Sequence, residues 1–483
     1  MAKINDLQFT KMKYSGEFTD TNHLSTALLT KPEISRTVAY AFGDKYHLSY
    51  LTQGSGRVSE KYKMIGNGEF MWSLMGQLTK SVAITGDTVP ARTTGDVGRG
   101  FSSFTIPLED KYFALGDKVR FGDRYTARVQ EEPRQVGRSY IYTMQLITHD
   151  GADAIPASLL EPGRSLGWAG TAFEEGSKGG SSKKATPMWF KNQMSTSRTS
   201  WGMTGSARTD IMALGMGKGK SGKQSFLWLY EEEYQQMLQI NRSAEIDRWY
   251  NRYNKSANGT VNLPGQSGRQ VKQGAGLLQQ LEGTNYREYS VLTEDYLRDF
   301  LTDLQIQAKD AENSHFMLFT GSEGLKQFDQ ALKSASATYQ LVDTHFVSKH
   351  GGDLKFGNNF RSYKGLLGST FTVAYNPLFD DATLHTEIDP ETNLPYESGR
   401  MVFMDMSDYE GEPNISLCAK GTDGVDRSMV HWCTEGSTTY QGGEAQKRMR
   451  SNDFDGFECH YLSETSMKVI NPLSCGQMIK RRV

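Results

Sequence analysis

The sequence predicts an α+β protein that is rich in loops, and three observations support this fold class. Short apolar runs alternate with turn residues from residue 45 to residue 148, which is typical of strands joined by turns. Two longer segments, residues 226–254 and 293–310, carry apolar residues at helical spacing. Residues 315–333 have the pattern of a strand, a turn and a helix, and short strands continue toward the C-terminus.

The length and composition indicate a globular protein of several packed units. The chain has 483 residues, more than the roughly 250–300 at which a single hydrophobic core stops growing. Hydrophobic residues make up 37% and charged residues 23%, which is enough apolar material to build cores. Because the net charge is only -2, a protein dedicated to coating nucleic acid is not expected. The first residues lack a signal-peptide pattern and no apolar stretch reaches membrane-spanning length, so we expect neither export nor membrane binding.

The clearest pair of elements is a β-hairpin at residues 124–148. Its strands are expected at residues 124–130 and 139–148, and the charged tip between them contains Pro133 and Gly137. The second strand carries apolar residues on both faces, so neither face is suited to water. An isolated two-stranded ribbon is marginally stable, so we expect other protein, such as a second copy of the chain, to cover it.

This hairpin supplies the candidate site of the chain, an assembly interface between subunits. The charged tip is suited to polar contacts at the rim of an interface, and the apolar stripe of the second strand to its centre. The predicted interface residues are Glu131, Glu132, Pro133, Arg134, Tyr140, Tyr142, Met144 and Leu146. If the stripe faces a neighbouring subunit, replacing Tyr140 and Tyr142 with serine leaves a folded subunit that assembles poorly.

The remaining elements follow in order along the chain. Residues 174–187 form a Gly/Ser/Lys tract that we interpret as a flexible loop or domain junction. The helix at residues 226–254 would be a rod of about 40 Å, and a second glycine-rich loop follows it. The helix at residues 293–310 precedes the strand–turn–helix segment, whose turn is expected at the GSEG sequence, residues 321–324. Later strands are expected at residues 371–375, 401–406 and 415–419.

Two motifs resemble binding sites without matching their patterns. Residues 217–224, GKGKSGKQ, approach a phosphate-binding loop, but Gln224 stands where a magnesium-binding hydroxyl belongs. We interpret this segment as a mobile basic loop. His431 and Cys433 share one face of a strand, and Cys459 follows later, but their spacing fits no standard zinc motif. We therefore assign no metal and no cofactor from the sequence, and metal binding by His431, Cys433 and Cys459 stays an open alternative.

The other reactive residue types do not form a recognisable active site. The chain has no GxSxG sequence, and its nine histidines are scattered. Two basic clusters, residues 447–450 and 480–482, are interpreted as solvated or interfacial charge. All four cysteines lie beyond residue 417 without a CxxC pair, so we expect reduced, partly buried thiols and an assembly that does not depend on disulfides. We therefore expect a protein that is not an enzyme.

Three segments carry a resemblance to a known family. They are residues 112–148, residues 187–207 with the sequence PMWFKNQMSTSRTSWGMTGSA, and residues 316–332 with the sequence FMLFTGSEGLKQFDQAL. In pattern and order the chain resembles the major capsid proteins of tailed bacteriophages with the Hong Kong 97-type fold, most closely those of crAss-like and related phages of Bacteroidetes. The residues 112–148 segment looks like the extended loop of that group. The resemblance covers about half of the chain, and none of its segments is a catalytic signature.

The resemblance implies a domain organisation and a function. The implied parts are an N-terminal arm (1–50), an extended-loop β region (51–170), a flexible junction and glycine-rich loop (171–222), a spine helix and peripheral domain (223–285), an axial α/β domain (286–410) and a return to the peripheral domain (411–483). Such proteins self-assemble into hexamers and pentamers of an icosahedral shell around double-stranded DNA. The implied partners are other capsid, decoration and portal proteins, with weak non-specific contact to packaged DNA. The implied location is the virion capsid, assembled in the host bacterial cytoplasm.

Two alternatives remain open at this point. Another virion protein, such as a tail or portal component, would also be rich in loops and β-hairpins. A phosphate-handling enzyme built on the loop at residue 217 is less favoured, because no second phosphate-binding or magnesium-binding segment accompanies it.

Overall fold

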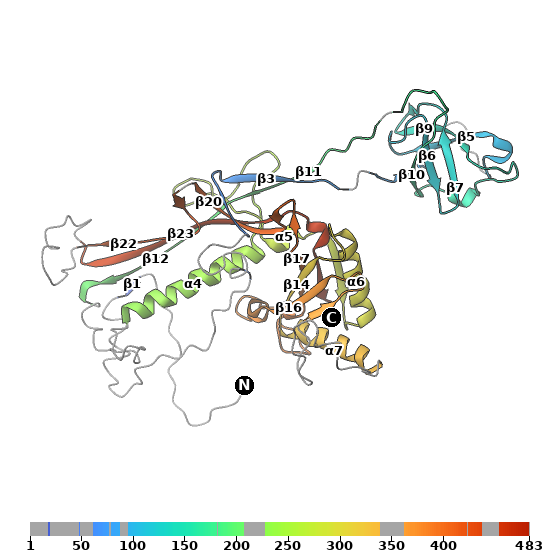
Figure 1. Ribbon diagram of the computed structural model, residues 1–483. Coiled ribbons are helices and arrows are strands. Elements are labelled where there is room, and N and C mark those ends of the chain that lie inside the picture. The colour runs from blue at the N-terminus through green and yellow to red at the C-terminus, as the bar shows by residue number, and fades with distance from the viewer. Residues whose placement is uncertain are drawn as a thin grey trace. The chain divides into compact units, whose positions relative to one another are not determined.

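The computed structural model describes residues 18–19, 48, 61–76, 79–86, 95–180, 182–206, 228–338, 362–422, 424–436 and 454–482. It divides the chain into two compact units (Figure 1). Unit 1 consists of Met1–Trp72 and Phe190–Val483, and unit 2 of Ser73–Trp189. Mixed sheets and a few helices make up the described parts, which confirms the α+β class.

Unit 2 is a β-sheet unit with its own hydrophobic core. Its strands are β4 (Val82–Ala83), β5 (Ser103–Leu108), β6 (Asp117–Phe121), β7 (Tyr125–Val129), β8 (Arg134–Val136), β9 (Ser139–Leu146) and β10 (Ser165–Thr171). The order in the sheet is β4-β10-β6-β7-β9-β5, and β8 also pairs with β9. Short 3-10 turns lie at Arg99–Phe101 and Ala157–Leu159. The two predicted hairpin strands are confirmed as β7 and β9, and the predicted tip contains the short strand β8.

The largest sheet of unit 1 is organised by one long strand, β23 (Gly456–Val469). It pairs antiparallel with β12 (Ser195–Thr204), β20 (Ile415–Thr422) and β22 (Val430–Glu435). The sheet is completed by β1 (Phe18–Thr19), β2 (Tyr62–Ile65) and β21 (Val425–Asp426). Helix α4 (Trp228–Tyr250) runs along β12 and β23, and its Ile240 packs on the core around Trp201 (Figure 1). The helix predicted at residues 226–254 is thereby confirmed.

A second sheet of unit 1 has the order β13-β24-β17-β14-β16-β15. Its strands are β13 (Asn285–Tyr289), β14 (His315–Thr320), β15 (Ser362–Lys364), β16 (Thr370–Tyr375), β17 (Met401–Asp405) and β24 (Gly476–Lys480). Helices α6 (Glu294–Gln307) and α7 (Ser322–Thr338) accompany it, with 3-10 turns η5 (Pro377–Asp380), η6 (Tyr396–Gly399) and η8 (Pro472–Ser474). The short helix α5 (Leu277–Gln280) contacts α4 and β23. The apolar face of α6, which includes Phe300, Leu301 and Leu304, is buried in the same core as Phe316 of β14.

Capping interactions explain where α6 and α7 begin. Thr293 caps α6 because its side chain accepts from the backbone N–H of Tyr296, and Glu294 lies in the first turn, where the helix dipole favours acidic residues. Helix α7 begins at Ser322, inside the segment predicted to be a turn. Its first N–H groups are satisfied by Asp380 and Ser398, which are distant in the sequence, so local pattern alone does not reveal this start.

The chain leaves unit 1 after Trp72 and returns to it at Phe190. Strands β3 (Glu69–Leu74) and β11 (Met188–Gln193) form a two-stranded sheet there. The rings of Trp72 and Phe190 stack with centroids 5.8 Å apart, and Phe70, Met194 and Cys418 share their cluster. None of the helices in the part of the chain that the structure describes combines the length and apolar composition that a membrane-spanning helix needs.

Candidate assembly surface

The apolar stripe of the predicted hairpin lies inside unit 2. Tyr142, Met144 and Leu146 are buried in the same core as Phe113 and Phe121. The Tyr142 hydroxyl donates to the carbonyl of Asp110 at 2.8 Å and accepts from the N–H of Tyr112 at 3.0 Å. Burial raises the pKa of Tyr142 to about 12. The expectation that these three side chains face another subunit is therefore corrected, because the core of unit 2 already covers this face of β9.

The tip of the hairpin is the part that remains available for contacts. Glu131, Glu132 and Arg134 are exposed, whereas Pro133 is buried and Tyr140 is half-buried against the core of unit 2. Glu131 accepts from the Thr143 hydroxyl at 3.1 Å, and Lys111 lies 3.9 Å from Glu132. Both interactions are exposed and therefore weak. The placement of an interface at this tip stays a prediction.

Lys183 anchors the Gly/Ser/Lys tract, a role that the sequence did not suggest. Its ammonium donates to Asp117 at 2.6 Å and to the carbonyl of Tyr112 at 2.8 Å. The same ammonium lies 4.3 Å from the centre of the Tyr112 ring and 5.7 Å from that of Trp168. Asp117 is buried and also accepts from the Trp168 indole. The carboxylate and the aromatic rings therefore form a cage for this lysine.

Replacing Lys183 with methionine is expected to destabilise unit 2 by about 1.5–3 kcal/mol, because Asp117 would keep a buried charge without its cation. Urea unfolding measures the loss, and limited proteolysis should cut residues 174–187 faster. Lys184→Met is the matched control, since Lys184 is exposed. Equal stability of the two variants would show that the cage does not hold the tract.

The C-terminal basic cluster is neutralised by acidic partners. Lys480 is buried and lies 2.6 Å from Asp389 and 3.9 Å from Glu323, both of which are also buried. Arg481 lies 3.5 Å from Glu288, and Arg482 lies 2.6 Å from Glu387. Lys480 is therefore not accessible to phosphate, whereas Arg481 and Arg482 are exposed and form surface ion pairs. The loop at residues 217–224 and the basic cluster at 447–450 lie outside the described residues.

A polar cavity of about 250 Å³ lies at the C-terminal end of α4. The Tyr250 hydroxyl lies 3.1 Å from His385 Nε2, and the Arg400 guanidinium donates to Glu397 and Gln477. Burial lowers the pKa of His385 and so favours the neutral imidazole. The residues that line this cavity include no serine, threonine or cysteine. The cavity therefore offers none of the side chains that a histidine base commonly activates as a nucleophile.

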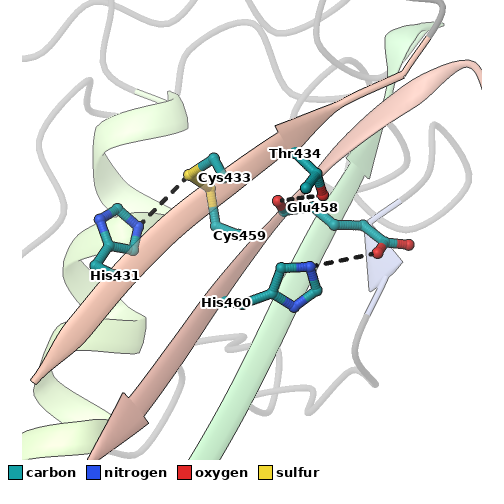
Figure 2. Close-up of a disulfide and its surroundings, with 6 residues drawn as sticks. All are labelled: His431, Cys433, Thr434, Glu458, Cys459 and His460. Atoms are coloured by element: carbon teal, nitrogen blue, oxygen red, sulfur yellow. Dashed lines mark hydrogen bonds and ion pairs between the residues drawn. A yellow bond between two sulfur atoms is a disulfide. The ribbon is translucent and has the colours of Figure 1, made fainter. Parts of the chain in front are cut away.

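Cys433 and Cys459 form a disulfide across β22 and β23 (Figure 2). The expectation that all four cysteines are reduced is corrected for this pair, because the two residues are direct cross-strand partners. His431 lies on the same face, with its Nε2 3.5 Å from Cys433 Sγ. Cys418 and Cys475 are free and buried, and burial raises the pKa of each thiol to about 12. The register between β22 and β23 places Cys433 opposite Cys459. This register cannot be read from the sequence alone, so the disulfide was not predicted.

Comparison with known proteins identifies relatives of the whole chain. The model of the Crassvirus major capsid protein family matches residues 1–483. The major capsid protein of Bacteroides phage crAss001 is 24% identical over 435 residues, which cover 84% of each chain. Among solved structures, the capsid of the Cyanophage P-SCSP1u is 7% identical over 65% of this chain and 81% of its own, with a TM-score of 0.34. The mature capsid of bacteriophage PhiM1 is 9% identical over 82% and 91%, with a TM-score of 0.33. These two scores are too low to carry an argument about the fold.

Proposed function

The chain belongs to the Crassvirus major capsid protein family and forms the shell of a phage capsid, and we propose that it does so as hexamers and pentamers of an icosahedral shell around double-stranded DNA. The observation that carries this proposal is the family match, which spans the entire chain. The described cavities and side-chain clusters add no catalytic constellation to it, so we expect no enzymatic activity.

The proposed fold is of the Hong Kong 97 type. In this assignment residues 1–50 are the N-terminal arm, and residues 51–170 are the extended-loop region. Helix α4 is the spine of the peripheral domain, and the sheet with α6 and α7 forms the axial domain at residues 286–410. The return of the chain after residue 411 is supported by β20 and β23, which pair with β2 and β12 of the first sheet. Strand β24 pairs instead with β13 and β17 of the second sheet. Residues 171–222 serve as the junction.

The proposed partners follow from the surface charge and from the family. Contact with packaged DNA is weak and non-specific, because the net charge is -2 and the cluster at 480–482 is paired with acidic residues. Decoration and portal proteins are further partners, and assembly takes place in the host bacterial cytoplasm. Within the shell, copies of this chain meet partly through the hairpin tip, where Glu131, Glu132 and Arg134 are exposed.

Particle images test the assembly. The purified chain, imaged by electron microscopy, is expected to form closed shells with five-fold and six-fold groups of subunits. Tubes or a single twelve-fold ring would instead support a tail or portal component. A nucleotide affinity that is lost in the Lys223→Ala variant would support the phosphate-handling alternative.

Reversing the charge at the tip is expected to slow assembly while leaving the subunit folded. Arg134→Glu should reduce the assembly rate by about 10-fold at low salt, because charges at the rim of an interface act mainly on the association rate. Light scattering follows the rate, and the defect should shrink as salt is added. Arg164→Glu is the control, because Arg164 is an exposed arginine of the same unit outside the tip. If both variants assemble at the wild-type rate, the tip is not part of the interface.

A further inference from the structure

The strand pair β22 and β23 gathers three side chains that bind soft metal ions. His431 and Cys433 are two residues apart on β22 and therefore lie on the same face. Cys459 is the cross-strand partner of Cys433, so it lies on that face as well. The imidazole nitrogen and the two sulfur atoms all lie within 4.8 Å of one another (Figure 2).

The spacing of these atoms matches a tetrahedral metal site. With Zn–S bonds of about 2.3 Å and Zn–N bonds of about 2.0 Å, tetrahedral angles place an N and an S ligand about 3.5 Å apart. His431 Nε2 and Cys433 Sγ lie 3.5 Å apart. The two sulfur atoms are bonded to each other in the structure, so reduction of the disulfide is required before both can serve as ligands.

The surroundings of the cluster orient the ligands and leave one side open. The His431 ring stacks on Tyr461, with centroids 4.2 Å apart and an interplanar angle of 20°, which holds the orientation of the imidazole. Cys459 is buried beside Trp201 and Tyr461, whereas His431 and Cys433 are exposed. A bound ion would thus have the core on one side and solvent on the other, with a fourth position free for water.

The other histidine and cysteine residues described near this sheet lie too far from the cluster, or on the wrong face, to serve as ligands of the same ion. His460 lies on the opposite face of β23, where it is 3.7 Å from Glu458 (Figure 2). Cys418 and Cys475 are fully buried in other clusters. The three candidate ligands are therefore His431, Cys433 and Cys459.

We propose that the reduced form of this strand pair binds a soft divalent cation such as Zn²⁺ through His431, Cys433 and Cys459, and that the disulfide form is the metal-free state of the same site. Two molecules of a small thiol such as glutathione reduce the disulfide, yielding two cysteine thiols and one glutathione disulfide. Metal binding then releases two protons from these thiols. In the reverse direction, the two sulfurs together lose two electrons to a disulfide oxidant, a new S–S bond forms and the ion leaves.

Metal binding to the full chain in both redox states tests the proposal. The chain is reduced with a phosphine, freed of reductant under anaerobic conditions, incubated with Zn²⁺ or Co²⁺ and desalted. Elemental analysis is expected to find about one ion per reduced chain and almost none on the oxidised chain. The Co²⁺ form should show thiolate-to-cobalt charge-transfer absorption. A reduced chain that retains no ion, or an oxidised chain that retains as much as the reduced one, would overturn the proposal.

Substitutions separate the metal site from the disulfide. Cys433→Ser should abolish both stoichiometric metal binding and the disulfide, which is counted as thiols in denaturant. His431→Ala should keep the disulfide but weaken metal binding by at least about 10-fold. His460→Ala is the matched control, and it should keep both properties. Circular dichroism verifies that each variant is folded, and equal metal affinity in the two histidine variants would exclude His431 as a ligand and overturn the proposed site.

Discussion

Replacing Tyr142 with alanine is expected to destabilise unit 2 by about 3–5 kcal/mol, which is the usual cost of deleting a large buried aromatic ring. The ring packs edge-on against Phe113 with centroids 6.0 Å apart, so its removal leaves a cavity at the centre of the core. It also removes the hydroxyl that bonds to the backbone of Asp110 and Tyr112. Urea unfolding of the full chain, together with limited proteolysis of unit 2, measures the effect.

Two further substitutions identify the origin of this loss. Tyr142→Phe keeps the ring and removes only the hydroxyl, so it should cost about 1–3 kcal/mol. Tyr140→Ala should cost less than Tyr142→Ala, because Tyr140 is only half-buried. A Tyr142→Ala chain with wild-type stability and a defect in assembly alone would restore the interpretation of this stripe as a subunit interface.

Replacing Lys480 with methionine is expected to cost about 3–5 kcal/mol, because it removes the cation from a buried group of charges. Asp389 and Glu323 would both remain buried, and Asp389 would lose its contact at 2.6 Å. Chemical unfolding at pH 7 measures the change. Arg481→Met is the control on the adjacent residue, whose exposed pair with Glu288 should contribute less than about 1 kcal/mol.

The pH dependence of the Lys480 variant gives an independent test. Burial alone raises the pKa of Asp389, but the hydrogen bond from Lys480 holds this pKa below its usual value in the wild-type chain. The ionised carboxylate therefore contributes stability above the unfolded-state pKa, and this contribution is lost as the pH falls through the lowered folded-state pKa. Lys480→Met removes the first of the interactions that lower this pKa and leaves the hydrogen bonds from Glu391 and Thr392, so the folded-state pKa of Asp389 should rise. The deficit of the variant should therefore shrink as the pH falls from 7 toward about 4, and a deficit that grows would contradict this account.

Replacing Asp389 with asparagine in the Lys480→Met background tests the same pair at constant pH. The double variant lacks both charges of the shortest contact, so part of the stability lost in the single variant should return. If the double variant is no more stable than Lys480→Met, the lost stability comes from the packing of the aliphatic part of the Lys480 side chain.

Elements with a strong local period could be predicted from the sequence. Helix α6 has a capping threonine, acidic residues in its first turn and apolar residues at helical spacing, and each of these signals acts within a few residues. The strand β14 is a short run of apolar and β-favouring residues and was predicted for the same reason.

Features that depend on tertiary contacts could not be predicted in this way. The apolar stripe of β9 shows that Tyr142 needs cover, but it does not show whether the cover comes from the same chain or from another. The Cys433–Cys459 pair depends on the register between β22 and β23, and Lys183 lies in a tract whose composition suggests no fixed contact. In each case the deciding partner is remote in the sequence.

The stacked rings of Trp72 and Phe190 have a consequence for how the gene can vary. They lie at the two points where unit 2 interrupts unit 1, so the ends of the interrupting stretch are already held together by contacts of unit 1. Unit 2 also has a hydrophobic core of its own, so its folding depends mainly on contacts within residues 73–189. Codons 73–189 should therefore be exchangeable as one cassette between related genes, and recombination at the two borders of this stretch should yield folded chains more often than recombination inside either unit.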